Sequence, residues 1–174
     1  VDNSPGMLRL ASQLASESVR VYPCDITDAS DQRLPSAHFD AVWCLWNVLG
    51  HALEHQQRRR AIVRIAATLR RGGRLFIDVS NRYNIAQYGL GTVVGNVWAD
   101  VVRPNSENGT VGYAIAVAPG KTIASSSHFF RPGELAPLFS AANLRPLKRM
   151  FVHYQSGAIT HRWGGQIFFI VEKI

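Results

Sequence analysis

Acidic side chains stand at two places where the sequence predicts that a buried strand ends. Asp2 follows Val1 and precedes a helix start at Ser4, and Asp25 follows the short predicted strand 19–22. Ligands of open α/β sheets bind outside the carboxyl ends of the strands, where an acidic residue can accept both hydroxyls of a ribose. Each carboxylate alone is equally consistent with a cap on the following helix. The two together predict a nucleotide site, with Asp2 at a ribose and Asp25 at an adenine amino group.

Two further strand ends supply the other candidate residues. The stretch from Leu45 to His51 follows one apolar run, and the stretch from Asp78 to Tyr83 follows the next. Histidine can serve as a general base near neutral pH, although a structural histidine is the alternative for His51. Tyr83 suits a pocket wall or the core, and Asn81 could equally bond to nearby backbone.

Strands and helices alternate along the first half of the chain, which favours a parallel sheet with right-handed crossovers. Ser4 has the type of an N-cap, and Pro5 suits the first helical position. The apolar run 39–46 predicts a strand buried on both faces. The expected elements are a helix over 4–15, strands over 19–22, 39–46 and 74–79, a loop or short helix over 27–36, and a helix over 54–71 that ends in a glycine cap at Gly72.

The second half predicts a small antiparallel insertion and an antiparallel end to the sheet. Asn108-Gly109 is a strong hairpin-turn signal, and residues 118–120 predict a second turn. We expect residues 84–130 to form a lid on the substrate side of a single domain, residues 1–174. The expected elements are β-rich segments over 97–102, 111–117 and 122–129, a helix over 132–142, and closing strands over 146–154 and 166–172.

The composition is that of an ordinary globular domain. The 174 residues are 47% apolar, their mean hydropathy is −0.03, and a chain of this length can bury a sizeable core. No run reaches the about 18 apolar residues of a membrane span, and no leader indicates secretion. We therefore expect a cytoplasmic protein with no membrane partner. Cys24 and Cys44 lack metal-ligand spacing and are predicted to be buried thiols, so no metal site is expected.

The net charge of +7 could indicate a nucleic-acid partner. Many of the basic residues belong to the predicted helix 54–71, where Ala61, Ile62 and Ile65 follow helical spacing on one face. The arginines should then occupy the solvated face, among them Arg58 and Arg64. No aromatic residues interleave with them to stack on bases. Nucleic acid stays open as a partner but is not favoured.

The order of these segments resembles a class I S-adenosylmethionine-dependent methyltransferase over nearly the whole chain. Residues 1–8 (Val-Asp-Asn-Ser-Pro-Gly-Met-Leu) are similar to that family's acidic second-strand motif, and Asp25-Ile26 to its adenine-side acidic position. Residues 39–42 resemble the fourth-strand motif, residues 69–75 the L-x-P-G-G-x-L motif with Arg71 in place of proline, and residues 128–135 the entry to the last helix.

This resemblance implies a Rossmann-like doubly wound sheet, mostly parallel with an antiparallel C-terminal edge. It also implies S-adenosylmethionine as the cofactor. The family's glycine-rich first motif does not occur in the sequence, so we expect a fragment that lacks the first strand and the glycine loop. The implied cofactor-binding residues are Asp2, Asn3, Met7, Asp25, Ile26 and Leu45.

Residues 39–51 and 77–84 are also similar to glycine and sarcosine N-methyltransferases. This narrower resemblance implies that Leu45 touches the adenine and that Asn47 and Arg82 engage a substrate carboxylate, with Arg82 one residue away from that family's arginine. Asn81 and Tyr83 would complete the substrate site. His51 follows the strand that would face the methyl group, which makes it the expected general base.

We therefore expect methyl transfer from S-adenosylmethionine to a small-molecule amine or hydroxyl. The sulfonium already activates the methyl group, so the protein chiefly has to align the acceptor and exclude water. An RNA or protein methyltransferase is one alternative, although no Asn/Asp-Pro-Pro-aromatic motif follows the fourth strand. A methyltransferase-fold remnant without catalysis is the other, because the glycine loop is missing from the sequence. The sequence does not indicate an oligomeric state.

Overall fold

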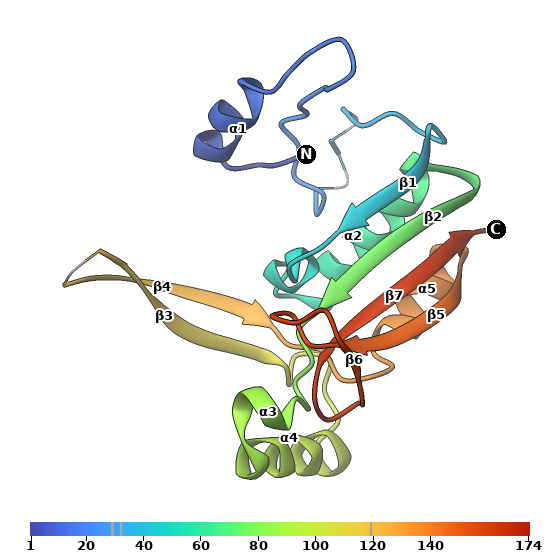
Figure 1. The fold of residues 1–174 in the computed structure, drawn as a ribbon. Coiled ribbons are helices and arrows are strands. Elements are labelled where there is room, and N and C mark those ends of the chain that lie inside the picture. Colours follow the sequence, from blue (N-terminus) through green and yellow to red (C-terminus); the bar gives the residue numbers. More distant parts are fainter. Residues whose placement is uncertain (29, 32, 119) are drawn as a thin grey trace.

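A computed structural model describes residues 1–28, 30, 31, 33–118 and 120–174, arranged around one five-stranded sheet and a separate two-stranded hairpin (Figure 1). In chain order the elements are α1 (Pro5–Ser12), β1 (Phe39–Cys44), the 3-10 helix η1 (Val48–His51), α2 (His55–Thr68), β2 (Leu69–Val79), α3 (Ile85–Tyr88), α4 (Leu90–Val102), β3 (Thr110–Ala118), β4 (Lys121–His128), α5 (Leu135–Ala141), β5 (Leu144–Val152), β6 (Ile159–Thr160) and β7 (Gln166–Lys173).

The five-stranded sheet has the order β1-β2-β7-β5-β6. β1 runs parallel to β2, whereas β2–β7, β7–β5 and β5–β6 are antiparallel pairs. Isolated parallel bridges join Asp2 to Pro23 and Asn81 to Phe130. The predicted α/β, Rossmann-like fold with an antiparallel C-terminal edge is confirmed. The antiparallel insertion is confirmed as the β3–β4 hairpin, which extends away from the main sheet (Figure 1).

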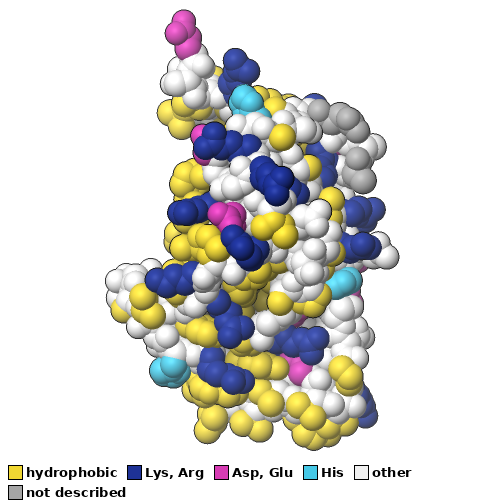
Figure 2. All heavy atoms as spheres, turned by 90° about the vertical axis from the view of Figure 1, so that its right-hand side faces the viewer, with side chains coloured by type: hydrophobic (Ala, Val, Ile, Leu, Met, Phe, Trp, Pro, Cys, Tyr) yellow, Lys and Arg dark blue, Asp and Glu magenta, His cyan; other side chains and the backbone are white. Residues whose placement is uncertain are grey.

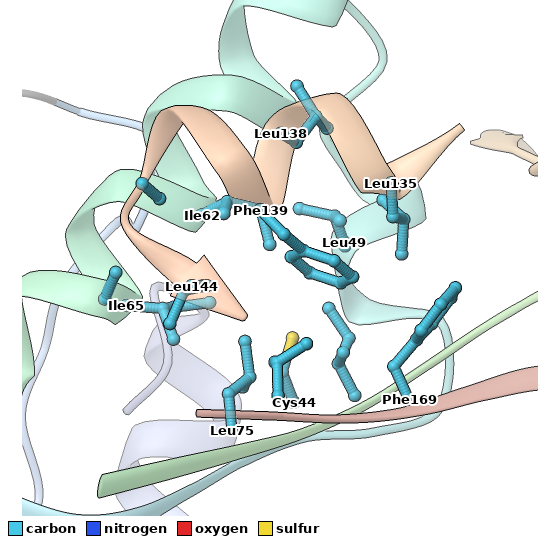
Figure 3. Close-up of a cluster of buried hydrophobic side chains, with 14 of the residues drawn as sticks. Cys44, Leu49, Ile62, Ile65, Leu75, Leu135, Leu138, Phe139, Leu144 and Phe169 are labelled. Atoms are coloured by element: carbon cyan, nitrogen blue, oxygen red, sulfur yellow. The ribbon is translucent and has the colours of Figure 1, made fainter. Parts of the chain in front are cut away.

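The core lies between one face of this sheet and the helices α2 and α5 (Figures 1 and 3). The predicted apolar face of α2 is confirmed, because Ala61 and Ile62 are fully buried and Ile65 is 6% exposed. Phe139 of α5 points into the middle of the cluster, where its ring meets Phe169 of β7 edge-on at 5.2 Å between centroids. This packing fixes the β1–β2 end of the sheet, from which the candidate site is built.

The prediction that β1 is buried on both faces is wrong. β1 is the edge strand of its sheet, and α2 and α5 cover only one face. Cys44 points into the core, whereas Trp43, the preceding residue, points to the other face and is 65% exposed. Its ring stacks on Phe76 of the neighbouring strand at 5.5 Å. Successive side chains of a strand alternate between faces, so an apolar run does not by itself show that both faces are covered.

Several predicted boundaries in the first half are also corrected. Residues 19–22 form no named strand, and only the Asp2–Pro23 bridge pairs this region. The second predicted helix ends at Thr68 rather than at Gly72, because Leu69 already has the extended backbone of β2. Gly72, with φ of 78°, lies at the irregular start of β2 instead. The described residues of the predicted loop 27–36 form turns and bends; residues 29 and 32 lie outside the described part.

The strand predicted over 97–102 is part of helix α4. Its valines favour a strand in isolation, but tertiary contacts override such preferences: Asp100 of α4 is buried against Arg82 and Tyr83. The hairpin turn predicted at Asn108-Gly109 precedes β3 and does not join two strands. The hairpin closes instead between Ala118 and Lys121; Pro119, in the second predicted turn, lies outside the described residues.

The expectation of a solvated arginine face on α2 fails at Arg58, whose side chain is fully buried. Its Nη1 donates to the carbonyl oxygens of Ala52 (3.1 Å) and Leu53 (2.6 Å), and its Nη2 donates to the Ser106 carbonyl (2.7 Å). The carboxylate of Glu107 lies 3.1 Å from the same Nη2. Arg58 thus joins α2 to the segment before β3, whereas its neighbour Arg59 is exposed.

We predict that Arg58→Ala destabilises the protein by about 2–5 kcal/mol, because the carbonyl groups of Ala52 and Leu53 lose their donor at about 1–3 kcal/mol each. The matched control Arg59→Ala, one residue away on the exposed face, should change the free energy of unfolding by less than about 0.5 kcal/mol. Urea unfolding followed by circular dichroism measures both. Equal midpoints for the two variants would show that the Arg58 contacts do not contribute to stability.

Candidate functional site

A cavity of about 860 Å³ runs along β1, between this strand and the N-terminal segment. Its lining brings together residues that lie far apart in the sequence, from the first residues, the stretch after Pro23 and the end of β1. The predicted residues that line it are Asp2, Asn3, Asp25, Ile26, Leu45 and His51. Met7 does not line the cavity; it lies on α1 and is 54% exposed.

Asp2 and Asp25 each begin a turn that their own carboxylates stabilise. Oδ1 of Asp2 accepts a bond from the Ser4 N–H at 2.7 Å, and Oδ1 of Asp25 accepts from both the N–H and the hydroxyl of Thr27 at 2.8 Å. The bonds from Thr27, the backbone one foremost, hold the pKa of Asp25 below its usual value. Neither carboxylate caps a helix, because Ser4 is the N-cap of α1 and Asp25 begins a turn; both residues line the cavity.

The two acidic turns are tied to each other and to α2. The Asp2 N–H donates to the Tyr22 carbonyl at 3.3 Å, and the Cys24 N–H donates to the Asp2 carbonyl at 3.0 Å. Nη1 of Arg64, on α2, donates to the Asp25 carbonyl at 3.1 Å. Arg64 was expected on a solvated face, but its side chain is only 14% exposed. It holds the wall of the cavity that carries Asp25.

Asn47 connects the ends of three strands. Its N–H donates to Oδ1 of Asp78 (3.0 Å), its Oδ1 accepts from the Ser80 N–H (2.9 Å), and its Nδ2 donates to the Ser127 hydroxyl (2.9 Å). Asn47 is 8% exposed and has a left-handed backbone, with φ of 55°. A Cβ on Gly50 would collide with its amide, so a glycine is needed there. These internal bonds occupy the amide that was expected to engage a substrate carboxylate.

Asp78 is the buried acidic group at the end of β2. Burial raises its pKa above the usual 3.8, against the opposing effect of the bond from the Asn47 N–H and of further bonds from Tyr154 and Trp46. Burial, together with the neighbouring Asp78, raises the pKa of Tyr154 in turn. Cys44, at the end of β1, is a free buried thiol whose pKa burial raises to about 12, as expected for a structural rather than a reactive cysteine.

The other predicted substrate residues do not line the cavity. Nη1 of Arg82 donates to Oδ1 of Asp100 at 3.1 Å, and the Tyr83 hydroxyl donates to Oδ2 of the same carboxylate at 2.7 Å. Burial and this carboxylate raise the pKa of Tyr83 to about 12. Nδ2 of Asn81 donates to the carbonyls of Arg162 and Gly165, both at 2.8 Å. These residues organise the segment between β2 and α4.

A second cavity, of about 580 Å³, lies beyond the end of β1. Leu45 lines the first cavity and Trp46, the next residue, lines the second, so both cavities reach the end of β1. Asn84, Tyr154 and Gln166 also line the second cavity, and sequence reasoning assigned none of them to a site. Asn84 alone carried a signal, because it follows the predicted strand end 78–83. Tyr154 and Gln166 come from the antiparallel end of the sheet and are near only in three dimensions.

His51, the expected general base, and His128 have different surroundings. His128 is fully buried, with Nδ1 3.1 Å from the Thr110 hydroxyl and Nε2 2.6 Å from Oε1 of Glu134. His51, at the end of η1, is exposed and lines the first cavity. Only His51 of the two is therefore accessible to a ligand in that cavity.

The surface charge, the possible metal ligands and the helix lengths bear on other classes of function. On the face shown in Figure 2, Lys and Arg side chains are spread out and separated by hydrophobic and other side chains. Among the described residues, no group of three or more His, Cys, Asp or Glu side chains is placed to hold a metal ion. The described helices include none with the length and apolar character that a membrane span requires.

One family model and many solved structures are similar to this chain. Residues 1–73 match a family model described as a methyltransferase domain. A S-adenosylmethionine-dependent methyltransferase from Methanosarcina mazei superposes with a TM-score of 0.65 at 16% identity, over 99% of this chain and 80% of that one. A S-adenosylmethionine-dependent methyltransferase from Clostridium acetobutylicum superposes with a TM-score of 0.62 at 14% identity, over 98% of this chain and 72% of that one.

A sugar N-methyltransferase from Streptoalloteichus superposes with a TM-score of 0.59 at 15% identity, over 98% of this chain and 68% of that one. The 1,6-didemethyltoxoflavin N1-methyltransferase of Burkholderia thailandensis superposes with a TM-score of 0.52 at 20% identity, over 97% of this chain and 56% of that one. Its structure contains 1,6-didemethyltoxoflavin and S-adenosylhomocysteine. The comparison with curated protein sequences gives no significant match. At these identities the superpositions show a shared fold.

We predict that Asp78→Asn gains stability relative to the unchanged protein as the pH rises. The carboxyl of the unfolded chain loses its proton near 3.8, whereas burial keeps the folded carboxyl protonated to higher pH. The contribution of Asp78 is therefore greatest below 3.8 and falls as the pH rises toward its folded pKa. Asn keeps the acceptor for the Asn47 N–H and has no charge to bury. Urea unfolding over a pH series measures the difference.

The control for this experiment is Asp40→Asn, which removes an exposed carboxylate from β1. The assignment of a raised pKa to Asp78 would be contradicted if the free energies of unfolding of Asp78→Asn and of the unchanged protein differed by a constant amount above pH 3.8.

Proposed function

We propose that this chain is a class I S-adenosylmethionine-dependent methyltransferase, as its fold and the family match of residues 1–73 support, and that it binds the cofactor along β1 and methylates a small molecule. The observation that carries the proposal is the convergence of Asp2, Asp25 and Leu45 on one cavity. These residues come from three separate segments, and the resemblance assigns each of them to the cofactor.

The lining of the cavity fits an adenosyl group. Its volume of about 860 Å³ is within the range of small-molecule and cofactor sites. Asp25 is ionised at neutral pH because its pKa is lowered, so it can accept a bond from an amino group while Ile26 packs on the ring. Asp2 is placed to accept bonds from ribose hydroxyls, and Leu45 adds an apolar wall. The cofactor, when bound, supplies a methyl group already activated by its sulfonium.

His51 is the general base in this proposal. It lines the cofactor cavity at the end of η1, and a base is required only where the acceptor must lose a proton. Asn47 takes the role of a positioning residue, because its amide orders the loop 45–51 instead of facing a ligand. Arg82, Tyr83 and Asn81 position the segment between β2 and α4 in the same indirect way.

A small-molecule acceptor is supported by the site and by the neighbours. The two cavities are compact, and the basic side chains in Figure 2 form no single patch of the kind that a nucleic acid needs. Two structural neighbours are named as N-methyltransferases, one of 1,6-didemethyltoxoflavin and one of a sugar. We therefore propose an amine acceptor ahead of a hydroxyl.

We predict that S-adenosylmethionine and S-adenosylhomocysteine bind the chain and that Asp2→Ala and Asp25→Ala each weaken binding about tenfold or more. A hydrogen bond to a charged group is worth about 1.5–3 kcal/mol, and 1.4 kcal/mol corresponds to tenfold in affinity. Isothermal titration calorimetry measures the dissociation constants, and circular dichroism verifies that each variant is folded.

Asp40→Ala serves as the matched control, because it removes a carboxylate from the same strand region without touching the cavity. Its affinity should equal that of the unchanged protein. Absence of heat with both cofactor forms would refute the proposal for this chain, as would equal losses in all three variants.

A further inference from the structure

We propose that the second cavity binds the methyl acceptor and that it selects an uncharged, flat molecule with an N–H or O–H donor. The inference rests on the proposed function, because it assigns the partner of the cofactor. Its first basis is position: successive residues, Leu45 and Trp46, line the two cavities, so the second cavity lies at the end of β1, which the first cavity also reaches.

The second basis is a buried acceptor without a donor. Asn84 is 5% exposed and lines the cavity, and its Oδ1 has no hydrogen-bond partner among the described residues. The orientation of the amide follows from its other end: Nδ2 donates to Oε1 of Gln87 at 3.5 Å, and that oxygen also accepts from Nε2 of Gln166 at 2.5 Å. Because Gln87 presents an acceptor, Asn84 turns its own carbonyl oxygen away from it.

A buried carbonyl oxygen without a partner is unfavourable, and native proteins contain few of them. The oxygen is covered by its surroundings, so the Asn84 amide must turn toward the cavity to meet a ligand; a ligand that then donates an N–H or O–H to it removes the penalty. A ligand of the same shape without the donor leaves it in place. Discrimination of this kind is stronger than discrimination by an added or missing methylene, since the site itself is left unpaired by the wrong molecule.

The third basis is an aromatic wall. Trp46 and Tyr154 line the cavity with their ring centroids 5.4 Å apart and a tilt of 44°. Trp46 is 76% exposed and has a left-handed backbone, with φ of 63°, which presents its ring at the surface instead of in the core. A flat ring covers such a surface better than an aliphatic chain, because aromatic rings associate through their faces and edges.

The fourth basis is charge. The described residues that line the cavity include no Asp, Glu, Lys or Arg, and their polar groups are amides, hydroxyls and the imidazole of His153. Arg82, the cation expected to meet a substrate carboxylate, is paired with Asp100 instead. A carboxylate placed in this cavity would lack a partner for its charge, which costs binding energy. Simple amino acids are therefore poor acceptors for this site.

The test compares benzimidazole, which has a ring N–H, with 1-methylbenzimidazole, which has the same ring system without it. Dissociation constants come from ligand-observed NMR titrations of the full chain. We expect benzimidazole to bind about tenfold more tightly, and glycine and sarcosine not to bind. Asn84→Leu, which keeps the side-chain volume, should reduce the ratio of the two affinities to about one. Trp46→Ala should weaken both ligands equally.

Gln56→Leu is the control, because it makes the same kind of change on the exposed surface of α2. It should keep the tenfold ratio. The inference is overturned if the unchanged protein binds both benzimidazoles equally, or if it does not bind benzimidazole. It is also overturned if Asn84→Leu keeps the tenfold ratio, or if glycine or sarcosine binds. Titration of S-adenosylmethionine into the same samples separates the two proposals: cofactor binding without this pattern refutes only the acceptor class, and loss of cofactor binding refutes the proposed function.

Discussion

The bonds of the Asn47 amide order the candidate site more than any other single interaction. They join the end of β1 to Asp78 near the end of β2, to Ser80 just after β2 and to Ser127 near the end of β4. The bonds to Ser80 and Ser127 come from a side chain, so the strand ends keep their spacing without continuous sheet pairing. A left-handed backbone at two successive residues, Trp46 and Asn47, turns the chain sharply there. Leu45 and Trp46 therefore face different cavities although they are neighbours in the chain.

The part of the site that the sequence predicted consists of residues that follow strand ends. Asp2, Asp25 and Leu45 line one cavity because the carboxyl ends of neighbouring strands meet at one edge, a rule that needs no knowledge of packing. Arg82 obeys the same rule, yet its guanidinium points to Asp100 of α4. Residue type and spacing place a side chain at an edge; the partner that it meets there depends on a helix that the sequence had predicted as a strand.

Two of the errors in the fold share one physical origin, because in both long-range packing outweighs a local preference. Residues 97–102 are rich in valine but form a helix, since Asp100 must reach Arg82 and Tyr83. Arg58 belongs to a strongly basic run, yet it is buried because carbonyl groups and Glu107 gather around it. The periodic apolar face of α2 and the antiparallel end of the sheet were predicted correctly, since both patterns are long and repeat regularly.

The order of the strands has a consequence for synthesis of the protein on the ribosome. β2 pairs with β7, the last strand of the chain, so the middle of the sheet must wait for residues 166–173. Until they emerge, β2 is paired only with β1, and of the two core helices only α2 can cover its inner face. Such pairings between distant segments form slowly and leave strand edges open to other chains. A nascent chain of this kind should depend on chaperones until its final strand is released.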